Sequence, residues 1–219
     1  MGSQQMASFW VWGVALLAYA AFLAWYVNWR GALSAGEIEA LVAQMRANDV
    51  GRGDQDELPA VRRFLEEDDG REFFMLNVIR MAPGDVADPA SGEMKPAREV
   101  MTGYTRMFLP ALFARGGHPA LAARRIGGMV DTWGLTDVPD WSMMGYVRYR
   151  SRRDLAHLVC DPRFGGAHAF KFAAMPQTFN FPTRPMIMTL AGPRVWAGMM
   201  MALAAAAAQI ILLVSAPPT

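Results

Sequence analysis

Two long apolar stretches, one near each end of the chain, constrain its fold more than any other feature of the sequence. They cover residues 9–27 and 195–216, and neither contains an acidic or basic side chain. A hydrocarbon core of about 30 Å is crossed by about 20 helical residues. We therefore expect transmembrane helices over residues 9–29 and 195–216, which hold the intervening chain at a membrane surface.

The basic residues beside the two stretches predict which side of the membrane this intervening part occupies. The tails, residues 1–8 and 217–219, carry no charged side chain, whereas Arg30, Arg184 and Arg194 flank the stretches on the inner side of the sequence. Cytoplasmic flanks carry the excess of Lys and Arg. The sequence thus predicts a two-pass protein of the inner membrane, with a cytoplasmic domain and both termini on the opposite side.

The second stretch is rich in small residues, which are typical of contacts between membrane helices. Gly198 and Ala202 would let another helix approach closely, and Gln209 is the one strongly polar side chain of the stretch. We expect a neighbouring helix to pack here and to supply a hydrogen-bond partner for Gln209. The alternative is that Gln209 is tolerated near one end of the span.

Composition excludes several classes of function. The net charge of +1 gives no basic surface for a nucleic acid. The single cysteine, Cys160, excludes an intrachain disulfide and a cysteine zinc site, and it suits a reducing compartment. The sequence contains no GxGxxG, P-loop, HExxH or CxxC motif, and its three histidines are scattered. We expect neither a metal nor a cofactor.

The central part of the chain predicts a helical connector followed by an α+β domain. In residues 30–71, Ser34 and Glu37 have capping-box spacing, and a second apolar helix follows. From residue 72 the pattern predicts, in order, a strand (72–81), a loop (82–95), a helix (97–115), two strands (119–129 and 141–149), helices (151–160 and 164–175) and a last strand (177–181). This β-α-β-β-α-β order is that of a ferredoxin-like domain over residues 72–184, joined by a linker, 185–194, to the second span.

Alternation along the strands predicts a sheet that is apolar on both faces. In the first strand Phe73 and Met75 share one face, while Leu76 and Val78 share the other; in the third strand Trp141 shares a face with Val147 and Tyr149. Both faces should therefore be covered. Helices can cover one of them, and a second sheet, the helices at 35–67 or a partner protein could cover the other.

Several motifs resemble the family called domain of unknown function 1330, in the dimeric α+β barrel superfamily. They are VRYRSRRDL at residues 147–155, DPRF at 161–164, the closing AAMPQT, and MLNVIR at 75–80. The resemblance covers roughly residues 72–184. It implies that two ferredoxin-like sheets pack face to face, usually from two chains.

Relatives in that superfamily include cofactor-independent monooxygenases, lactone isomerases and haem-handling enzymes. The resemblance implies a pocket between the sheet and its helices that is lined by Asn77, Arg80, Tyr104, Arg148, Tyr149 and His168. His168 or Tyr149 would move a proton there, and Arg148 would stabilise an enolate or carboxylate. The structural alternative is that the aromatic residues and His168 pack in the core and that Arg148 forms an ion pair.

The densest basic cluster comprises Arg148, Arg150, Arg152, Arg153 and Arg163. Three interpretations are open: a solvated helix start, contact with anionic lipid headgroups, and docking to an acidic protein surface.

The sequence therefore favours a non-catalytic accessory subunit of a larger membrane complex, for example a respiratory or photosynthetic one, that braces its cytoplasmic face. Two alternatives are a membrane-bound oxygenase or isomerase that acts on a hydrophobic substrate, and a homodimer that binds a small lipid-like ligand.

Overall fold

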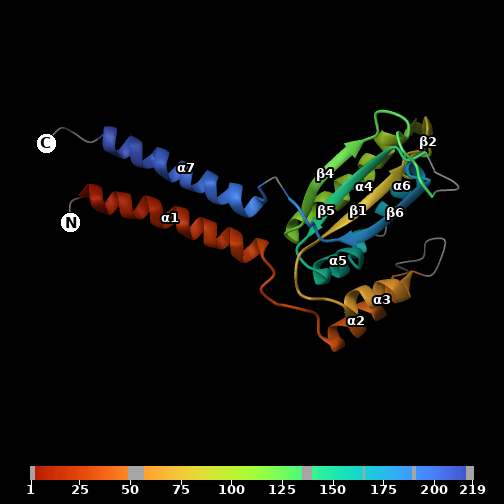
Figure 1. The fold of residues 1–219 in the computed structure, drawn as a ribbon, viewed down its shortest axis with the longest axis horizontal. Helices are drawn as coiled ribbons and strands as arrows, with labels where there is room; N and C mark the ends of the chain where they lie inside the picture. The colour runs from red at the N-terminus through yellow and green to blue at the C-terminus, as the bar shows by residue number, and fades with distance from the viewer. Residues whose placement is uncertain (1–2, 49–56, 135–139, 165, 189–190, 216–219) are drawn as a thin grey trace. The chain divides into compact units, whose positions relative to one another are not determined.

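The computed structural model describes residues 3–48, 57–134, 140–164, 166–188 and 191–215. The chain divides into two compact units, which we describe separately (Figure 1). Met1–Trp29 and Pro185–Thr219 form the helix pair, and Arg30–Arg184 form the sheet domain.

The helix pair consists of α1 (Ser3–Tyr26) and α7 (Pro193–Val214). Both helices are long and apolar enough to cross a membrane, over Gln5–Tyr26 and Pro193–Val214. At about 1.5 Å per residue, either segment spans about 33 Å, close to the thickness of a hydrocarbon core. The two apolar helices expected from the sequence are therefore confirmed.

The helix that packs against the second apolar stretch is the first one. A Cβ atom on Gly198 would lie 3.2 Å from the ring of Tyr19, so the absence of a side chain permits this close approach. Gln209 Nε2 donates a hydrogen bond to Ser8 Oγ over 2.7 Å. Ala202 stays exposed and takes no part in the closest packing. The chain thus supplies both the neighbouring helix and a partner for Gln209.

The sheet domain is an α+β domain built on a four-stranded antiparallel sheet. Its strands, in the spatial order β4-β5-β1-β6, are β4 (His118–Arg124), β5 (Met143–Tyr149), β1 (Phe73–Arg80) and β6 (Gln177–Thr183). The helical segments of this part of the chain are α4 (Ala97–Ala114), α5 (Arg152–Val159), the 3₁₀ helix η1 (Pro162–Phe164) and α6 (Ala167–Ala174).

The structure differs from the expected elements at the predicted loop and at the end of the second strand. The predicted loop contains a hairpin of β2 (Asp85–Ala87) and β3 (Met94–Pro96), in which Lys95 forms a 2.8 Å ion pair with Asp88. The second strand of the main sheet ends at Arg124 instead of continuing to residue 129. Arg124 pairs with Met143, the first residue of β5, so a longer β4 would have no partner strand beyond that point.

The described helices of the sheet domain all lie on one side of the sheet. Phe73 of β1 belongs to a buried cluster with Leu112 of α4 and Leu158 of α5, and Ile79 packs against residues of α4 and α6. Figure 1 shows α4 and α6 behind the strands, so the view is onto the opposite face.

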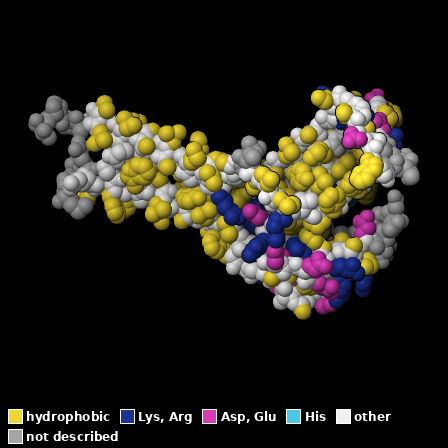
Figure 2. All heavy atoms as spheres, viewed as in Figure 1, with side chains coloured by type: hydrophobic (Ala, Val, Ile, Leu, Met, Phe, Trp, Pro, Cys, Tyr) yellow, Lys and Arg dark blue, Asp and Glu magenta, His cyan; other side chains and the backbone are white. Residues whose placement is uncertain are grey.

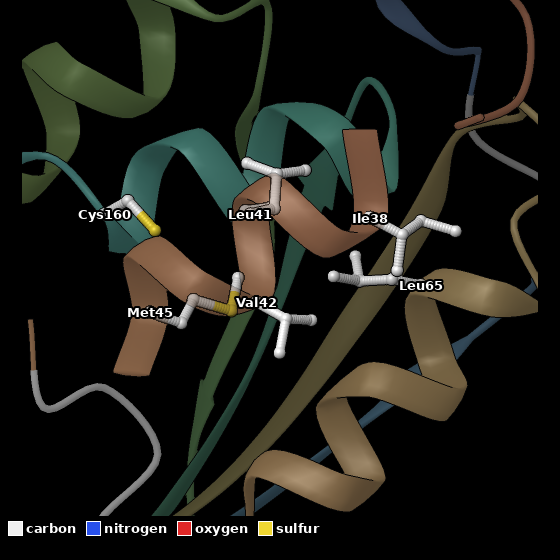
Figure 3. Packing of buried hydrophobic residues seen from close by; sticks show 7 residues of the cluster. Ile38, Leu41, Val42, Met45, Leu65 and Cys160 are labelled. Atoms are coloured by element: carbon white, nitrogen blue, oxygen red, sulfur yellow. The ribbon is translucent and has the colours of Figure 1, made fainter. Parts of the chain in front are cut away.

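The helical connector forms a further layer on this same side. It consists of α2 (Ala35–Ala47), which begins with the predicted capping box of Ser34 and Glu37, and α3 (Leu58–Glu66). The buried cluster of the connector, shown in Figure 3, consists of Ile38, Leu41, Val42, Met45, Leu65, Ala156 and Cys160. The last two belong to α5 and its C-terminal end, so the connector packs outside α5. It does not cover the second face of the sheet, which excludes one of the three coverings considered above.

Two arginines at the start of α5 form hydrogen bonds and ion pairs with the connector. Arg153 donates hydrogen bonds to the carbonyl oxygens of Gly31 and Ala32, each over 3.1 Å, and pairs with Glu37 over 3.1 Å. Arg152 lies 3.7 Å from Asp68 and donates a hydrogen bond to the carbonyl of Phe64. The path of the chain into the domain is therefore fixed by charge as well as by apolar packing.

We predict that Gly103→Ala destabilises the sheet domain by about 1–3 kcal/mol, because overpacking outweighs the helix propensity of Ala. A Cβ atom at Gly103 of α4 would lie 2.4 Å from the ring of Phe170 on α6. Gly36→Ala is the matched control, because a Cβ atom there meets nothing within 4 Å. Thermal unfolding of the full chain in detergent measures both variants; equal gains in stability for the two would contradict the prediction.

Glu37 should contribute stability that depends on pH. The Ser34 backbone N–H and the Arg153 side chain lower the pKa of Glu37 to about 2. Because the folded pKa lies below the ordinary value of about 4.3, this contribution is complete above that value and is lost as the pH falls toward 2. The stability difference between the wild type and Glu37→Gln, measured by urea unfolding, should therefore shrink below about pH 4.5. A difference independent of pH would argue against the pair.

Candidate functional site

The sheet divides the six residues that were expected to line one pocket. Residues that face each other in an antiparallel pair share a face, and so do residues two apart in a strand. Tyr149 pairs with Phe73, and both belong to the cluster on the helix side, together with Tyr104. Asn77 has the same parity as Phe73.

The two arginines of the expected pocket have the opposite parity. Arg148 pairs with Phe74, and Arg80 pairs with Gln177, to whose side chain Arg80 Nη1 donates a 3.1 Å hydrogen bond. The structure thus places Arg148 and Arg80 on the other face from Asn77 and Tyr149. The expected combination of Arg148 with Tyr149 and His168 is not assembled.

On the helix side, the candidate acid–base groups lie in aromatic packing. Tyr104 stacks on Phe108 with ring centroids 5.3 Å apart, and His168 meets the ring of Phe164 edge-to-face at 5.6 Å. Burial raises the pKa of Tyr104 and Tyr149, so both phenols stay protonated. Burial, with a smaller effect of nearby Lys171, lowers the pKa of His168, so its imidazole is neutral near pH 7.

Lys171 joins this aromatic layer, although the sequence analysis did not predict it. Its Nζ atom lies 5.9 Å from the ring centroid of Tyr104, and burial lowers its pKa. The signal available in the sequence was its position three residues after His168, on the same face of α6. Asn77 in turn donates its side-chain amide to the carbonyl oxygen of Met75 over 3.1 Å, within its own strand.

A shallow, open depression of about 340 Å³ lies along α4 and is lined by Thr102, Thr105, Arg106, Leu109 and Pro110. None of the expected pocket residues lines it. Among the described residues, no group of three or more His, Cys, Asp or Glu side chains is placed to hold a metal ion.

The side chain of Arg148 is buried and bonded to other parts of the domain. Its side chain is 1 % exposed, and Nε donates a 3.0 Å hydrogen bond to Glu72 while Nη1 donates to the carbonyl of Gly116. The guanidinium therefore links the turn before β4 to the segment before β1 by hydrogen bonds. These contacts indicate a structural role for Arg148 in the sheet.

Each arginine of the basic cluster has an acidic partner within the domain. Its remaining members form ion pairs: Arg150 with Asp154, Arg152 with Asp68, Arg153 with Glu37, and Arg163 with Asp161. The side chains of Arg152 and Arg153 are only 15 % and 5 % exposed, whereas that of Arg163 is 79 % exposed. Arg163 also lowers the pKa of Asp161. These contacts pair the cluster with acidic residues of the domain itself, an arrangement that none of the three interpretations from the sequence included.

The second face of the sheet carries a continuous set of apolar side chains, which we call the open sheet face. By strand parity it comprises Leu76, Val78, Leu121, Ala123, Met144, Tyr146, Phe179 and Phe181, together with Phe74, which is buried. Leu121, Phe179 and Phe181 are 50 %, 43 % and 46 % exposed. Figure 2 shows hydrophobic side chains gathered over this side of the sheet. The alternation of Phe179 and Phe181 in the last strand was the sequence signal for this surface.

Trp141 was assigned to the wrong face. Strand β5 begins at Met143, so the alternation does not extend back to Trp141. Its ring meets that of Phe179 edge-to-face, with centroids 5.1 Å apart, on the open sheet face. Ser142 lies between Trp141 and the first residue of β5. Its backbone N–H donates the last hydrogen bond to β1 on this side, to the carbonyl of Ile79.

Comparisons with known proteins show the fold of the domain and leave its activity open. No family model matches the chain, and no curated protein matches it. The RPA0582 protein of unknown function from Rhodopseudomonas palustris has a similar solved structure, with a TM-score of 0.50 and 19 % identity over 61 % of this chain and 95 % of that chain. A methylated form of RPA0582 gives a TM-score of 0.51 and 22 % identity, over 62 % and 95 % of the two chains.

We predict that Arg153→Gln lowers the free energy of unfolding by about 2–4 kcal/mol. The substitution removes a buried charged donor from two backbone carbonyls, and it removes one of the two arginines that pair with Glu37. Arg163→Gln should change it by less than about 0.5 kcal/mol, because Arg163 is largely exposed. Urea unfolding of the full chain in detergent measures both. Equal changes in the free energy of unfolding for the two substitutions would show that the contacts of Arg153 with the connector do not stabilise the domain.

Proposed function

We propose that this protein is a membrane-anchored, non-catalytic accessory subunit that docks through its open sheet face onto a larger membrane complex. The observation that carries the proposal is a sheet face with three exposed large apolar side chains, Leu121, Phe179 and Phe181, in a chain that also has two membrane-length helices. A sheet with two apolar faces needs a layer on each. The connector, which could have supplied the second layer, packs on the other side.

We also propose the finer assignment of the fold, a ferredoxin-like domain similar to domain of unknown function 1330. The spatial strand order β4-β5-β1-β6, with α4 after β1 and α5 and α6 before β6, supports it. In that superfamily a second sheet covers the face in question. The resemblance therefore supports a covering layer on this face, and it leaves open whether a second copy or another protein supplies that layer.

The aromatic layer argues for assembly over catalysis. A general acid–base site needs groups that reach the substrate. Here His168 and the two tyrosines lie in ring contacts, and Arg148 lies on the other face in an ion pair. The arginines of the basic cluster are likewise engaged in ion pairs within the domain, which weakens the case for binding of an anionic substrate.

The proposed topology places the sheet domain in the cytoplasm and both termini across the membrane. Arg30 and Arg184 lie at the two ends of the domain, and Arg194 is the second residue of α7, so the Lys and Arg bias at the span ends favours this orientation. The domain would then brace the cytoplasmic face of the complex.

Purification of the native protein in a mild detergent, followed by mass spectrometry and an absorption spectrum, tests the proposal. Stoichiometric recovery with a larger membrane complex is the expected result, and a bound pigment or haem would identify a photosynthetic or respiratory host. Recovery as a colourless homodimer would overturn the accessory-subunit proposal and favour the ligand-binding homodimer.

A charge on the open sheet face should disrupt docking. We predict that Phe179→Asp or Phe181→Asp weakens association with the complex by about a hundredfold, because a carboxylate would be buried in an apolar contact. Phe113→Asp on α4 is the matched control, because Phe113 is 47 % exposed, against 43 % and 46 % for the two sheet residues. Quantitative co-purification measures the effect; equal losses for all three variants would refute the role of this face.

A further inference from the structure

The open sheet face is bounded at one end by an arginine. Two apolar rows cross the strands of this face: Leu121, Tyr146, Leu76 and Phe181, and then Ala123, Met144, Val78 and Phe179. Arg80, the last residue of β1, has the same parity as Val78 and lies beyond the second row. It pairs with Gln177 of β6, two residues before Phe179. Arg80 thus borders the apolar surface on which docking is proposed.

Arg80 brings an unbalanced positive charge to this border. It is partly exposed, and its Nη1 donates a 3.1 Å hydrogen bond to the side-chain oxygen of Gln177. No other hydrogen bond or ion pair links the Arg80 side chain to the described part of the chain. Asp140, in the connection that leads to β5, pairs with Arg125. A layer that covers this end of the face would bury the charge of Arg80, and a buried charge needs a partner.

The guanidinium of Arg80 favours a carboxylate as that partner. A guanidinium carries five N–H donors in a planar fork and no acceptor, and it binds a carboxylate through two parallel hydrogen bonds. The hydrogen bond to Gln177 uses one donor of Arg80. A surface complementary to the open sheet face should therefore be apolar over the two rows and acidic beside Arg80.

A second copy of this chain does not offer that complement. In a symmetric dimer the same face would lie on both sides of the contact, and the four strands contain no Asp or Glu. Glu72, just before β1 at the other end of the face, pairs with Arg148, whose side chain is 1 % exposed. Moving Glu72 to Arg80 of the other copy would leave a buried arginine without its carboxylate, which is strongly destabilising. Charge complementarity therefore favours a different protein.

We propose that the open sheet face binds a different protein subunit, whose apolar docking surface carries an Asp or Glu side chain that pairs with Arg80. The inference rests on the proposed function and specifies the chemistry of the partner at that same surface. The two apolar rows supply the contact area, with Phe179 and Phe181 as aromatic anchors. The ion pair of Arg80 fixes the orientation of the partner on the sheet and disfavours a second copy.

A carbodiimide, which joins an amine directly to a carboxylate in contact with it, tests this ion pair. The full chain contains only two lysines, Lys95 and Lys171, so Arg80→Lys introduces one new and identifiable amine. In the complex purified in mild detergent, we expect a crosslinked peptide that joins position 80 to an Asp or Glu of another subunit. Lys95 and Asp88, which lie 2.8 Å apart, should crosslink within the chain and show that the reagent has reacted.

A second substitution ties the crosslink to the open sheet face. Adding Phe179→Asp to Arg80→Lys should remove the crosslink at position 80, because the partner then leaves this face. A crosslink that persists in this double variant would overturn the inference. So would a crosslink from position 80 to a second copy or within the chain, or none at position 80 while Lys95 and Asp88 react.

Loss of the charge should weaken docking. Arg80→Gln should reduce retention in the complex by about thirtyfold or more, because the carboxylate of the partner stays buried without a counter-charge, and Arg80→Lys should keep most of it. Arg106→Gln on α4 is the matched control, since Arg106 is exposed and the net charge changes equally. Thermal unfolding of Arg80→Gln should match the wild type, because the side chain of Arg80 bonds only to Gln177 among the described residues. Equal retention of Arg80→Gln and Arg106→Gln would contradict the inference.

The failure of this inference and the failure of the proposed function give different results. If Arg80→Gln keeps full retention while Phe179→Asp loses it, the inference is wrong and the proposed function stands. If the wild type co-purifies with no complex, the proposed function fails and the inference fails with it.

Discussion

The described helices of the sheet domain pack on a single face of a sheet that is apolar on both. On the covered face, Phe73 and Tyr149 meet the side chains of α4 and α5. On the other face, Phe179 and Phe181 are about half exposed. Removing these apolar side chains from water would be favourable, which is the physical basis of the proposed docking.

The arginines at the start of α5 hold the connector on the helix side of the sheet. Arg153 holds the chain at Gly31 and Ala32, and Arg152 reaches Asp68 and Phe64 at the end of α3. The connector is thereby fixed against α5, on the side where the sheet already has helices. A basic cluster that resembles a binding surface in the sequence thus forms ion pairs within the domain, whereas the exposed large side chains of the second sheet face are apolar.

The candidate site could be predicted only in part. The types of residue near the aromatic layer were identified, because Tyr104, Tyr149 and His168 lie on elements whose order the sequence predicts. Their combination with Arg148 was wrong, because a strand places successive side chains on opposite faces. Adjacent positions such as Arg148 and Tyr149 therefore cannot serve one pocket between the sheet and its helices. Lys171 was missed because burial on α6 depends on the packing of α4, which no local pattern encodes.

The sequence by itself determined the elements: two apolar helices of membrane length, the capping box at Ser34, and the succession of strands and helices. These follow from local hydrophobic period and capping, which neighbouring residues specify. Tertiary structure decided on which side of the sheet the connector packs, which carboxylate each arginine meets, and where β4 ends. Those outcomes depend on residues far apart in the chain, such as Arg153 and Gly31 or Arg124 and Met143, and only the folded chain brings them together.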